Sequence, residues 1–323
     1  MTIAVILNFR QLDLTLQCIK HTRSQEGVHV LVVDNGSGDG SAAKLASGAL
    51  ASGELLALDR NLGFAGGMNA GIRAALDRGA DAVWLLNNDA FPAIGCLDRL
   101  LQALDSAPRL GMVTPRILIP DGSEQHVGGI VDWSGLGNGT LLDARQFQEE
   151  EAPDRWITGC APLIRAESLK EVGLFEDSFF AYWEDVDLSV RMTRAGWRLG
   201  CCENAVVTHI GGASSGGLQS EFVESLILRN HAFLVKRHQP ESVSRVVRWR
   251  IAARIAGRIG DRRAEYGGLK TDHLIGALYS VVFQHYSNPN EVRIPNWFRR
   301  MASRSAYRWQ SLFERLAGHG RPA

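Results

Sequence analysis

Several features that would assign this chain of 323 residues to a class are missing from it. No apolar run approaches the roughly 20 residues that a helix needs to cross a bilayer, so the sequence predicts no membrane-spanning segment. The five cysteines contain no C-x-x-C pair and are odd in number, which argues against structural zinc and for a reducing, cytoplasmic compartment. No Gly-Lys-Ser or Gly-Lys-Thr occurs, which excludes a P-loop nucleotide hydrolase.

The glycine-rich dinucleotide fingerprint is also missing. The glycines at 36–40 follow the second predicted strand and run G-x-G-x-G, where the fingerprint requires G-x-G-x-x-G after the first strand. This argues against a hydride-transfer enzyme. What remains is an ordinary globular composition, 45% hydrophobic and 22% charged, of a size that suits one large domain with or without an appendage.

The net charge of zero conceals an uneven distribution along the chain. Residues 229–323 carry 18 Lys+Arg and 6 Asp+Glu, a net charge of +12, whereas residues 1–228 carry 17 and 29, a net charge of −12. A basic segment of this kind favours contact with an anionic surface. The alternative is a solvated helical face that partly neutralises the acidic part of the chain.

Short runs of Val, Ile and Leu alternate with segments of helical periodicity in the first hundred residues. The apolar runs are 3–7, 28–34, 54–58 and 82–86, and the helical segments are 11–24, 41–50 and 66–78. This alternation predicts an α/β fold with a mostly parallel central sheet flanked by helices. Ligands bind at the carboxyl ends of the strands in such sheets, and the residues there are polar: Asn8, Asp34, Asp59 and Asn87-Asn88-Asp89.

The second half of the chain follows a different pattern. Residues 110–165 combine short strand-like pieces with Gly- and Asp-rich turns, 184–195 are helical in pattern, and 197–209 predict one or two strands ending at His209. From about residue 219 the pattern is helical and basic. We therefore expect a catalytic domain over 1–218 and a basic helical C-terminal region over 219–323.

The segment most suggestive of chemistry joins an aromatic run to three carboxylates. Phe179-Phe180-Ala181-Tyr182-Trp183 leads directly into Glu184, Asp185 and Asp187. Clustered carboxylates raise one another's pKa, which turns one of them into a usable general base near neutral pH. The aromatic side chains would form an apolar wall for a sugar, or alternatively part of the core.

A second acidic element lies about a hundred residues upstream. Asp89 follows an apolar strand and is flanked by the amides of Asn87 and Asn88, a setting that suits Mg²⁺ or Mn²⁺ completed by phosphate oxygens. His209, before a Gly/Ser loop that could close over a diphosphate, is a second candidate for contact with the metal or the phosphates. An Asx turn and an ordinary packed histidine are the structural alternatives.

Two further segments could contact a nucleotide. Asp34 could accept hydrogen bonds from a nucleobase or ribose, although a turn that leads into a capped helix explains the segment equally well. Gly66 and Gly67 would allow a backbone to pass close to a ligand at a helix N-terminus. The alternative for these glycines is a tight strand-to-helix junction.

These pieces together resemble the family-2 inverting glycosyltransferases of the GT-A fold, and most closely the bacterial rhamnosyltransferase-like branch that builds surface polysaccharides. The resemblance covers about residues 3–215. The matching pieces, in the order found in that family, are Asn8, Val33-Asp34-Asn35-Gly36-Ser37, Asn61–Asn69, Asn87-Asn88-Asp89, Thr158-Gly159-Cys160, Glu184-Asp185-Val186-Asp187 and His209.

The resemblance implies a role for each of these positions. Asp185 would be the general base, oriented or raised in pKa by Glu184, while Asp89 and His209 would hold the Mg²⁺ or Mn²⁺ ion. The residues that would bind the nucleotide and donor are Asn8, Asp34, Asn61, Gly66, Asn69, Asn88 and Arg191. Many relatives carry Asp where this chain has Asn87, which leaves one carboxylate in the metal motif.

The implied reaction moves a sugar, with rhamnose from dTDP-rhamnose favoured over galactofuranose or another hexose from a UDP-sugar, onto a saccharide or lipid-linked acceptor. One rival is a nucleotidyltransferase, but the basic glycine-rich loop it would need near the N-terminus is missing at 7–12. A non-catalytic carbohydrate-binding protein on the same fold is the other. No nucleic-acid partner is expected.

The basic C-terminal region predicts a partner of its own. Arginines recur at helical spacing between 245 and 263 among Trp249 and aliphatic residues, as in a helix that lies at a membrane interface. We expect peripheral binding to an anionic membrane at the cytoplasmic side. The alternative is packing of this face on the catalytic domain or on a second subunit of a homo-oligomer.

Overall fold

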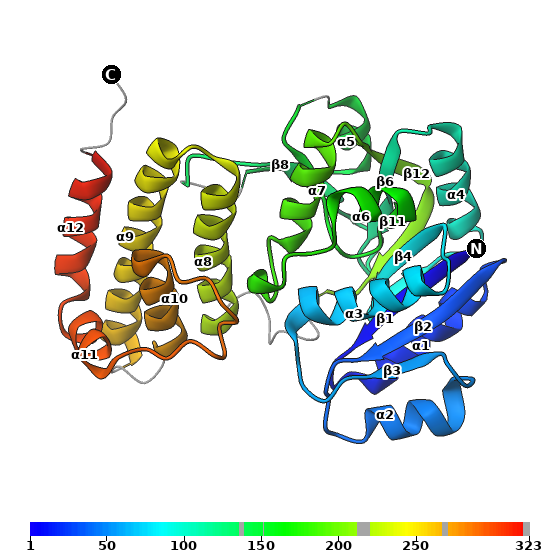
Figure 1. The fold of residues 1–323 in the computed structure, drawn as a ribbon, viewed down its shortest axis with the longest axis horizontal. Helices are drawn as coiled ribbons and strands as arrows, with labels where there is room; N and C mark the ends of the chain where they lie inside the picture. Colours follow the sequence, from blue (N-terminus) through cyan, green and yellow to red (C-terminus); the bar gives the residue numbers. More distant parts are fainter. Residues whose placement is uncertain (136–138, 151, 212–219, 267–270, 319–323) are drawn as a thin grey trace. The chain divides into compact units, whose positions relative to one another are not determined.

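The computed structural model describes residues 1–135, 139–150, 152–211, 220–266 and 271–318. By their contacts the residues form two compact units, and both are drawn in Figure 1. The first unit comprises Met1–Val131, Thr140–Asp177 and Glu184–Ser214. The second comprises Asp132–Gly139, Ser178–Trp183 and Ser215–Ala323. The predicted boundary at 218/219 therefore misses two short segments that belong with the C-terminal helices.

The N-terminal part of the first unit is a parallel βαβ arrangement. Its strands are β1 (Thr2–Asn8), β2 (Val28–Asp34), β3 (Leu55–Ala57) and β4 (Ala82–Asn87), with β1 between β2 and β4. Its helical segments are α1 (Leu12–Arg23), α2 (Ser41–Lys44), η1 (Leu45–Ala49) and α3 (Gly63–Asp77). Successive side chains of β1 point to opposite faces and nearly all are buried, so helices cover both faces of the sheet.

Beyond β4 the nine-stranded sheet is mixed. The strand order is β3-β2-β1-β4-β11-β6-β12-β5, with β7 beside β6. The strands added here are β5 (Ala90–Pro92), β6 (Leu110–Leu118), β7 (Glu124–Gln125), β11 (Leu163–Arg165) and β12 (Arg198–His209). β11 runs antiparallel to both β4 and β6, whereas β6 and β12 again run parallel, so the predicted parallel pairing holds for β1 to β4 and for β6 with β12. A buried strand has the same apolar pattern in either direction.

The remaining elements of the first unit surround this sheet. A second sheet has the order β10-β8-β9 and contains β8 (Gly128–Ile130), β9 (Thr140–Leu142) and β10 (Arg155–Ile157). The remaining helices are α4 (Cys96–Ser106), α5 (Ala144–Glu149), α6 (Ala166–Val172) and α7 (Glu184–Arg194); η2 (Asp177–Phe179) crosses from the first unit into the second. The predicted helix at 184–195 and strand at 197–209 are thus confirmed nearly residue for residue.

The sheet register brings the polar strand ends together. Asn8 is paired with Asp34 on β2, and Leu7 is paired with Asn87 on β4. At the far side of the sheet, the last residue of β12, His209, is paired with Ala90 on β5. Since Ala90 follows Asp89 directly, this pairing explains how a residue more than a hundred positions away reaches the acidic strand end.

The second unit is helical. It contains α8 (Glu221–His238), α9 (Glu241–Tyr266), α10 (Asp272–Phe283), α11 (Asn296–Arg304) and α12 (Ala306–Gly318), the yellow to red part of Figure 1. Its own apolar core includes Leu228, Leu274, Leu278, Phe298 and Phe313. Among the residues that the structure describes, no helix is both long enough and apolar enough to span a membrane.

The apolar face of α9 does not match the predicted membrane-interface helix. Its aliphatic residues Val247, Ile251, Ile255 and Ile259 are buried in the core of the second unit. Arg258 and Arg262 form ion pairs with Glu224 on α8, at 2.9 Å in each case. An amphipathic helix with basic edges is equally suited to a helical bundle, and α9 packs in such a bundle.

Candidate active site

Asp34 organises a network at the ends of β1 and β2. One of its carboxylate oxygens accepts hydrogen bonds from Asn8 Nδ2 at 2.6 Å and from Ser37 Oγ at 2.7 Å, and the other accepts from the Ser37 N–H at 3.1 Å. The carboxylate is nearly fully buried. These hydrogen bonds offset the cost of burying the carboxylate. Asp34 therefore fixes the conformation of the chain at this edge of the sheet, and it is also a candidate contact for the nucleotide.

The network continues from Asn8 to the end of β4. Thr15 Oγ1 donates to Asn8 Oδ1 at 2.7 Å, and Asn88 Nδ2 donates to Thr15 Oγ1 at 3.1 Å. Asn8 and Thr15 are fully buried and Asn88 nearly so. The structure therefore brings together three of the predicted donor-binding residues, Asn8, Asp34 and Asn88, through one hydroxyl group that sequence reasoning did not identify.

Asp89 and His209, the two predicted metal ligands, are neighbours. His209 Nε2 lies 3.2 Å from one Asp89 oxygen, and the Gly211 N–H donates to the other at 3.1 Å. The second ring nitrogen of His209 is 2.9 Å from Gln125 Oε1. Burial lowers the pKa of His209, but contacts with Cys160 and Asp89 outweigh it and raise that pKa above its ordinary value. The rest of the predicted Gly/Ser loop, 212–217, lies outside the described residues.

The side chains at this strand end fit a weakly held divalent cation. Asp89 supplies the one carboxylate, His209 an imidazole, and the Asn87 carboxamide lies 3.5 Å from His209 Nε2. Within the described residues, no group of three or more His, Cys, Asp or Glu side chains could hold a metal ion. Mg²⁺ and Mn²⁺ accept such an incomplete set when substrate phosphates and water supply the other ligands. The donor set therefore suits a cation that binds together with a diphosphate.

Gly159 and Cys160 connect this cluster to the acidic helix. The Gly159 N–H donates to Asp185 Oδ2 at 2.9 Å, and the Cys160 carbonyl accepts from the Asn87 N–H at 2.9 Å. A Cβ atom at Gly159 would lie 3.3 Å from the ring of Phe64 and 3.7 Å from Asp185 Cβ, so a larger residue would crowd this contact. Two consecutive residues thus contact both the predicted base and the predicted metal motif.

Glu184 and Asp185 occupy the first turn of α7 in different environments. Burial, and then the nearby charge of Asp185, raise the pKa of Glu184 well above its ordinary value. Burial also raises the pKa of Asp185, although hydrogen bonds from the N–H groups of Gly159 and Val186 oppose the rise. Glu184 Oε2 is buried without a hydrogen-bond partner in the described structure. The two acids therefore differ in their surroundings: two backbone N–H groups favour the charged form of Asp185, whereas Glu184 has no such support at one of its oxygens.

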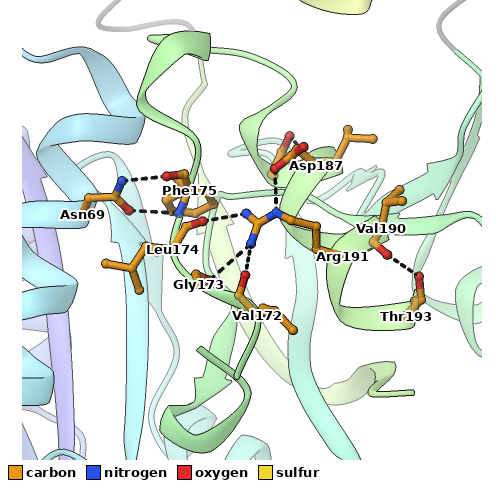
Figure 2. Close-up of polar contacts among 11 residues, drawn as sticks. Asn69, Val172, Gly173, Leu174, Phe175, Asp187, Val190, Arg191 and Thr193 are labelled. Carbon is orange, nitrogen blue, oxygen red and sulfur yellow. Dashed lines mark hydrogen bonds and ion pairs between the residues drawn. The ribbon is translucent and has the colours of Figure 1, made fainter. Parts of the chain in front are cut away.

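Arg191, which was predicted to contact a diphosphate, forms hydrogen bonds within the protein. Its Nε donates to Asp187 at 2.8 Å, and its other nitrogens donate to the carbonyls of Val172 and Leu174 at 2.6 Å, as Figure 2 shows. A further bond at 3.3 Å reaches the Gly173 carbonyl. These contacts use most of the guanidinium donors, so we assign Arg191 to holding α7 against the end of α6.

Asn69 and Asn61 also make internal contacts. Asn69 exchanges two hydrogen bonds with the Phe175 backbone, at 2.9 and 3.0 Å, and donates to Asp177 at 2.6 Å (Figure 2 shows the Phe175 pair). Asn61 Oδ1 accepts from Asn35 Nδ2 at 3.1 Å and from the Gly63 N–H at 2.8 Å. Asn61 thus shapes the start of α3, and Asn69 fixes the loop that leads to η2.

The glycines of α3 serve packing. A Cβ atom at Gly66 would lie 2.7 Å from Leu62 Cβ, and one at Gly71 would lie 2.3 Å from Val5 Cγ1. Gly67 is equally confined, with Leu7 Cδ1 at 2.6 Å from its added Cβ. Gly67 and Gly71 thus allow the helix to approach the sheet, whereas Gly66 is confined by Leu62 at the start of the helix itself, and donor binding by Gly66 stays a prediction.

Sequence reasoning missed several residues that complete the site. Ser37, Thr15, Gln125 and Gly159 hold Asp34, Asn8, His209 and Asp185, respectively. Ser37 lies three residues after Asp34, and Gly159 lies in the segment Thr158-Gly159-Cys160 that carries part of the resemblance. Their places in these two segments were the available signal. Nothing in the sequence marks Thr15 or Gln125, because their partners are brought to them by the fold alone.

The chain is similar in sequence to known glycosyltransferases. The family model of glycosyl transferase family 2 matches residues 3–173, more than half of the chain. The N-acetylglucosaminyl-diphospho-decaprenol L-rhamnosyltransferase of Mycobacterium tuberculosis is 28% identical over 237 residues, which cover 67% of this chain and 77% of that protein. Galactofuranosyltransferase GlfT1 of Mycolicibacterium smegmatis is 28% identical over 212 residues, 64% of this chain and 70% of that protein.

Solved structures share the fold at lower identity. A mannosyltransferase from Pyrobaculum calidifontis, in complex with GDP-Man and Mn²⁺, superimposes with a TM-score of 0.56 at 15% identity and covers 98% of this chain and 86% of that one. GalNAc-T7 with UDP, GalNAc and Mn²⁺ gives a TM-score of 0.58 at 14% identity, over 88% of this chain and 58% of that one. The predicted GT-A fold is thereby confirmed.

Proposed function

The chain belongs to glycosyl transferase family 2, and from that membership we propose that it is an inverting hexosyltransferase in which Asp185 is the catalytic base. The observation that carries the proposal is the division of roles at the start of α7. Asp185 accepts hydrogen bonds from the N–H groups of Gly159 and Val186, whereas burial and the charge of Asp185 raise the pKa of Glu184 well above its ordinary value. A base needs to be positioned and to have a pKa near the working pH, and the contacts and the raised pKa of Asp185 support it in that role.

In the proposed reaction Asp185 accepts the proton of the acceptor hydroxyl. The oxygen attacks the anomeric carbon of the donor from the face opposite the diphosphate, and a new C–O bond forms as the bond to the diphosphate breaks. The products are the inverted glycoside and a nucleoside diphosphate, with the proton on Asp185. Asp34, Asn8 and Asn88, joined in one network, support the nucleotide end of the donor.

The second requirement is stabilisation of charge on the leaving diphosphate. Asp89 and His209 would hold a Mg²⁺ or Mn²⁺ ion, which supplies electrostatic stabilisation of that charge. The solved structures of similar fold contain Mn²⁺ together with a nucleotide or nucleotide sugar. Arg191 is left out of this part of the proposal, because its donors are bonded to Asp187 and to backbone carbonyls.

For the donor sugar we favour rhamnose from dTDP-rhamnose, and for the acceptor a saccharide or a lipid-linked saccharide of cell-surface polysaccharide synthesis. The similarity to the mycobacterial rhamnosyltransferase supports this choice. The similarity to GlfT1 supports the alternative, galactofuranose from a UDP-sugar. Both relatives are equally identical to this chain, so the donor must be determined by experiment.

The test is a donor panel with the purified full chain. dTDP-rhamnose, UDP-galactofuranose, UDP-glucose and GDP-mannose are each incubated with Mg²⁺ or Mn²⁺ and a synthetic GlcNAc-diphospho-lipid acceptor, and both the released nucleoside diphosphate and the glycoside are measured. We expect turnover with dTDP-rhamnose. Turnover only with a UDP-sugar would establish the alternative. Binding of a sugar nucleotide without any turnover would instead support a non-catalytic carbohydrate-binding protein.

Peripheral contact with an anionic membrane remains part of the proposal, on residues other than those first expected. In α11 and α12 the side chains of Trp297 and Tyr307 are more than half exposed, and Arg300, Arg304 and Arg308 are exposed beside them in sequence. Exposed aromatic and basic side chains together are typical of an interfacial surface. A lipid-linked acceptor would make such contact useful, and the cytoplasmic face is the side that carries anionic lipid.

A further inference from the structure

A short segment before the catalytic helix has an unusual backbone. Phe180, Tyr182 and Trp183 all have positive φ angles, of 66°, 69° and 76°. Residues with bulky side chains rarely adopt this left-handed conformation, and they keep it only when the surrounding structure enforces it. The next two residues of the chain are Glu184 and Asp185. Whatever enforces this conformation therefore determines how the backbone enters α7.

Asn230 of α8 supplies the main restraint. Its Nδ2 group donates hydrogen bonds to the carbonyls of Phe179, Ala181 and Tyr182, at 2.8, 2.8 and 2.9 Å. The side chain is fully buried, with no exposed surface. A single carboxamide thus gathers three carbonyls of one irregular turn, which water cannot reach in its place.

The neighbours of Asn230 in sequence fix the same segment. Arg229 Nη1 donates to the Ser178 carbonyl at 3.0 Å and to Asn230 Oδ1, which orients the carboxamide so that its nitrogen faces the turn. The ring of His231 stacks on Trp183, with centroids 4.5 Å apart and planes at 16°. His231 Nε2 donates to the Asp132 carbonyl at 2.9 Å, and burial lowers the pKa of His231.

We propose that Arg229, Asn230 and His231 are positioning residues that hold the left-handed segment 178–183 and thereby fix the acidic pair at the start of α7. The inference rests on the proposed role of Asp185. It also assigns the aromatic residues: Trp183 packs on His231, so its ring belongs to the positioning device and not to a wall for the acceptor.

The experiment compares Asn230→Asp with the wild type and with Asn290→Asp. The aspartate at 230 has the same shape but no N–H to donate, and Asn290, exposed in the same unit, provides the matched chemical change. We expect Asn230→Asp to lower kcat by roughly 10²-fold, the usual effect of a small misplacement of a reacting group. Its affinity for nucleoside diphosphate should stay close to that of the wild type, and Asn290→Asp should match the wild type in both.

Two further readouts separate positioning from general stability. Amide hydrogen exchange of peptides covering 178–190 should become faster in Asn230→Asp while exchange over β1 and β2 is unchanged, and the acidic limb of the kcat–pH profile should shift. His231→Ala, which removes the stacked ring and its hydrogen bond to the Asp132 carbonyl but leaves the contacts of Asn230, should show the same effects more weakly and serves if Asn230→Asp does not fold. A lower melting temperature with kcat and the pH profile unchanged would overturn the inference.

The outcome also separates this inference from the proposed function. If Asp185→Asn is inactive while Asn230→Asp and His231→Ala keep the kcat and pH profile of the wild type, the positioning role alone is wrong. If Asp185→Asn retains activity, the proposed base is wrong and the positioning role falls with it.

Discussion

At the scale of single residues, the proposed chemistry depends on two adjacent acids whose surroundings differ. Two carboxylates in one helical turn repel each other, so the more deeply buried one takes up a proton first. Glu184 is the buried member, with an oxygen that has no hydrogen-bond partner in the described structure. Asp185 is more exposed and receives the Gly159 N–H. In the proposed mechanism, these different surroundings favour Asp185 over Glu184 as the base.

This assignment predicts that Glu184→Gln retains most of the transfer activity, because a carboxamide resembles the neutral acid. A glutamate with a raised pKa in the folded state stabilises the protein fully below its ordinary pKa of 4.5 and loses that stability as pH rises through the raised value. Glu184→Gln should therefore flatten the fall of melting temperature at rising pH. Thermal unfolding of both proteins between pH 4 and 9 measures this, and a loss of activity like that expected for Asp185→Asn would contradict it.

A second prediction at this scale concerns the metal. Asp89 is the one carboxylate of its motif, so the cation and the diphosphate should bind as a unit. Calorimetry should show tighter binding of nucleoside diphosphate with Mn²⁺ or Mg²⁺ than with EDTA, and Asp89→Ala should remove the difference. Asp105→Ala, which removes an exposed carboxylate near the end of α4, is the control and should keep it. Equal affinity of the wild type with and without metal would show that the metal role is wrong.

Residue identity alone predicted which side chains gather, but not what each one does. Asn8, Asp34, Asn88, Asp89 and His209 stand at strand ends, and the register of the sheet brings them into contact as expected. The internal hydrogen bonds of Arg191 could not be predicted, because a sequence does not show which carbonyls a guanidinium will reach. The left-handed backbone at 180–183 could not be predicted either, since aromatic residues normally avoid that conformation.

At the scale of elements, α3 shows how glycine can serve packing where a ligand was expected. The helix approaches β1 and β2 so closely that an added Cβ at Gly71 would lie 2.3 Å from Val5 Cγ1 and 2.9 Å from Val33 Cγ2. Both atoms belong to β-branched residues of buried strands, which cannot move aside freely. A glycine-rich helix start has the same sequence whether it faces a sheet or a diphosphate, so the pattern could not decide.

We predict that Gly71→Ala destabilises the protein by about 1–3 kcal/mol, because overpacking outweighs the better helix propensity of alanine, which is worth up to about 1 kcal/mol. Gly48→Ala is the matched control, since nothing lies within 4 Å of a Cβ added there and φ is not positive. Denaturant unfolding of the two variants measures the difference. A Gly71→Ala variant as stable as Gly48→Ala would show that the helix and the sheet can move apart at no cost.

The pattern of α9 could be read in two ways for a similar reason. Its aliphatic stripe and arginines suit a membrane interface and a helical bundle equally, and only the partner decides. In this protein α9 packs in a core with α8, α10 and α12. The local sequence of α9 does not predict that packing. The alternation of strands and helices from β1 to β4 was a stronger signal, because each short apolar run there fits only a buried strand of the sheet.

At the scale of the whole molecule, the uneven charge finds only part of its explanation in the fold. Arg258 and Arg262 are neutralised by Glu224, whereas the arginines of α11 and α12 at 300, 304 and 308 are exposed. Each cation near an anionic surface contributes about 1 kcal/mol, and salt weakens the attraction. The exposed arginines of α11 and α12 are therefore the residues on which the proposed membrane contact rests.

This predicts that the protein sediments with vesicles containing anionic lipid at low salt and is released at high salt. Replacing Arg300, Arg304 and Arg308 together by glutamine should reduce the bound fraction without lowering transfer to a water-soluble acceptor. Replacing Arg23, Arg78 and Arg145, which lie in the first unit, is the matched control. Binding that is unaffected by the first set, or absent at low salt, would show that these arginines have no membrane role.

The central claim, that this chain transfers a sugar with Asp185 as base, is tested most directly by one comparison. Steady-state transfer is measured for the wild type and Asp185→Asn with dTDP-rhamnose, and with UDP-galactofuranose if the panel selects it, and nucleoside diphosphate binding is titrated on both proteins. The account predicts a loss of about 10²–10⁴-fold in kcat with nucleotide affinity close to that of the wild type. Activity of Asp185→Asn within about tenfold of the wild type would contradict it.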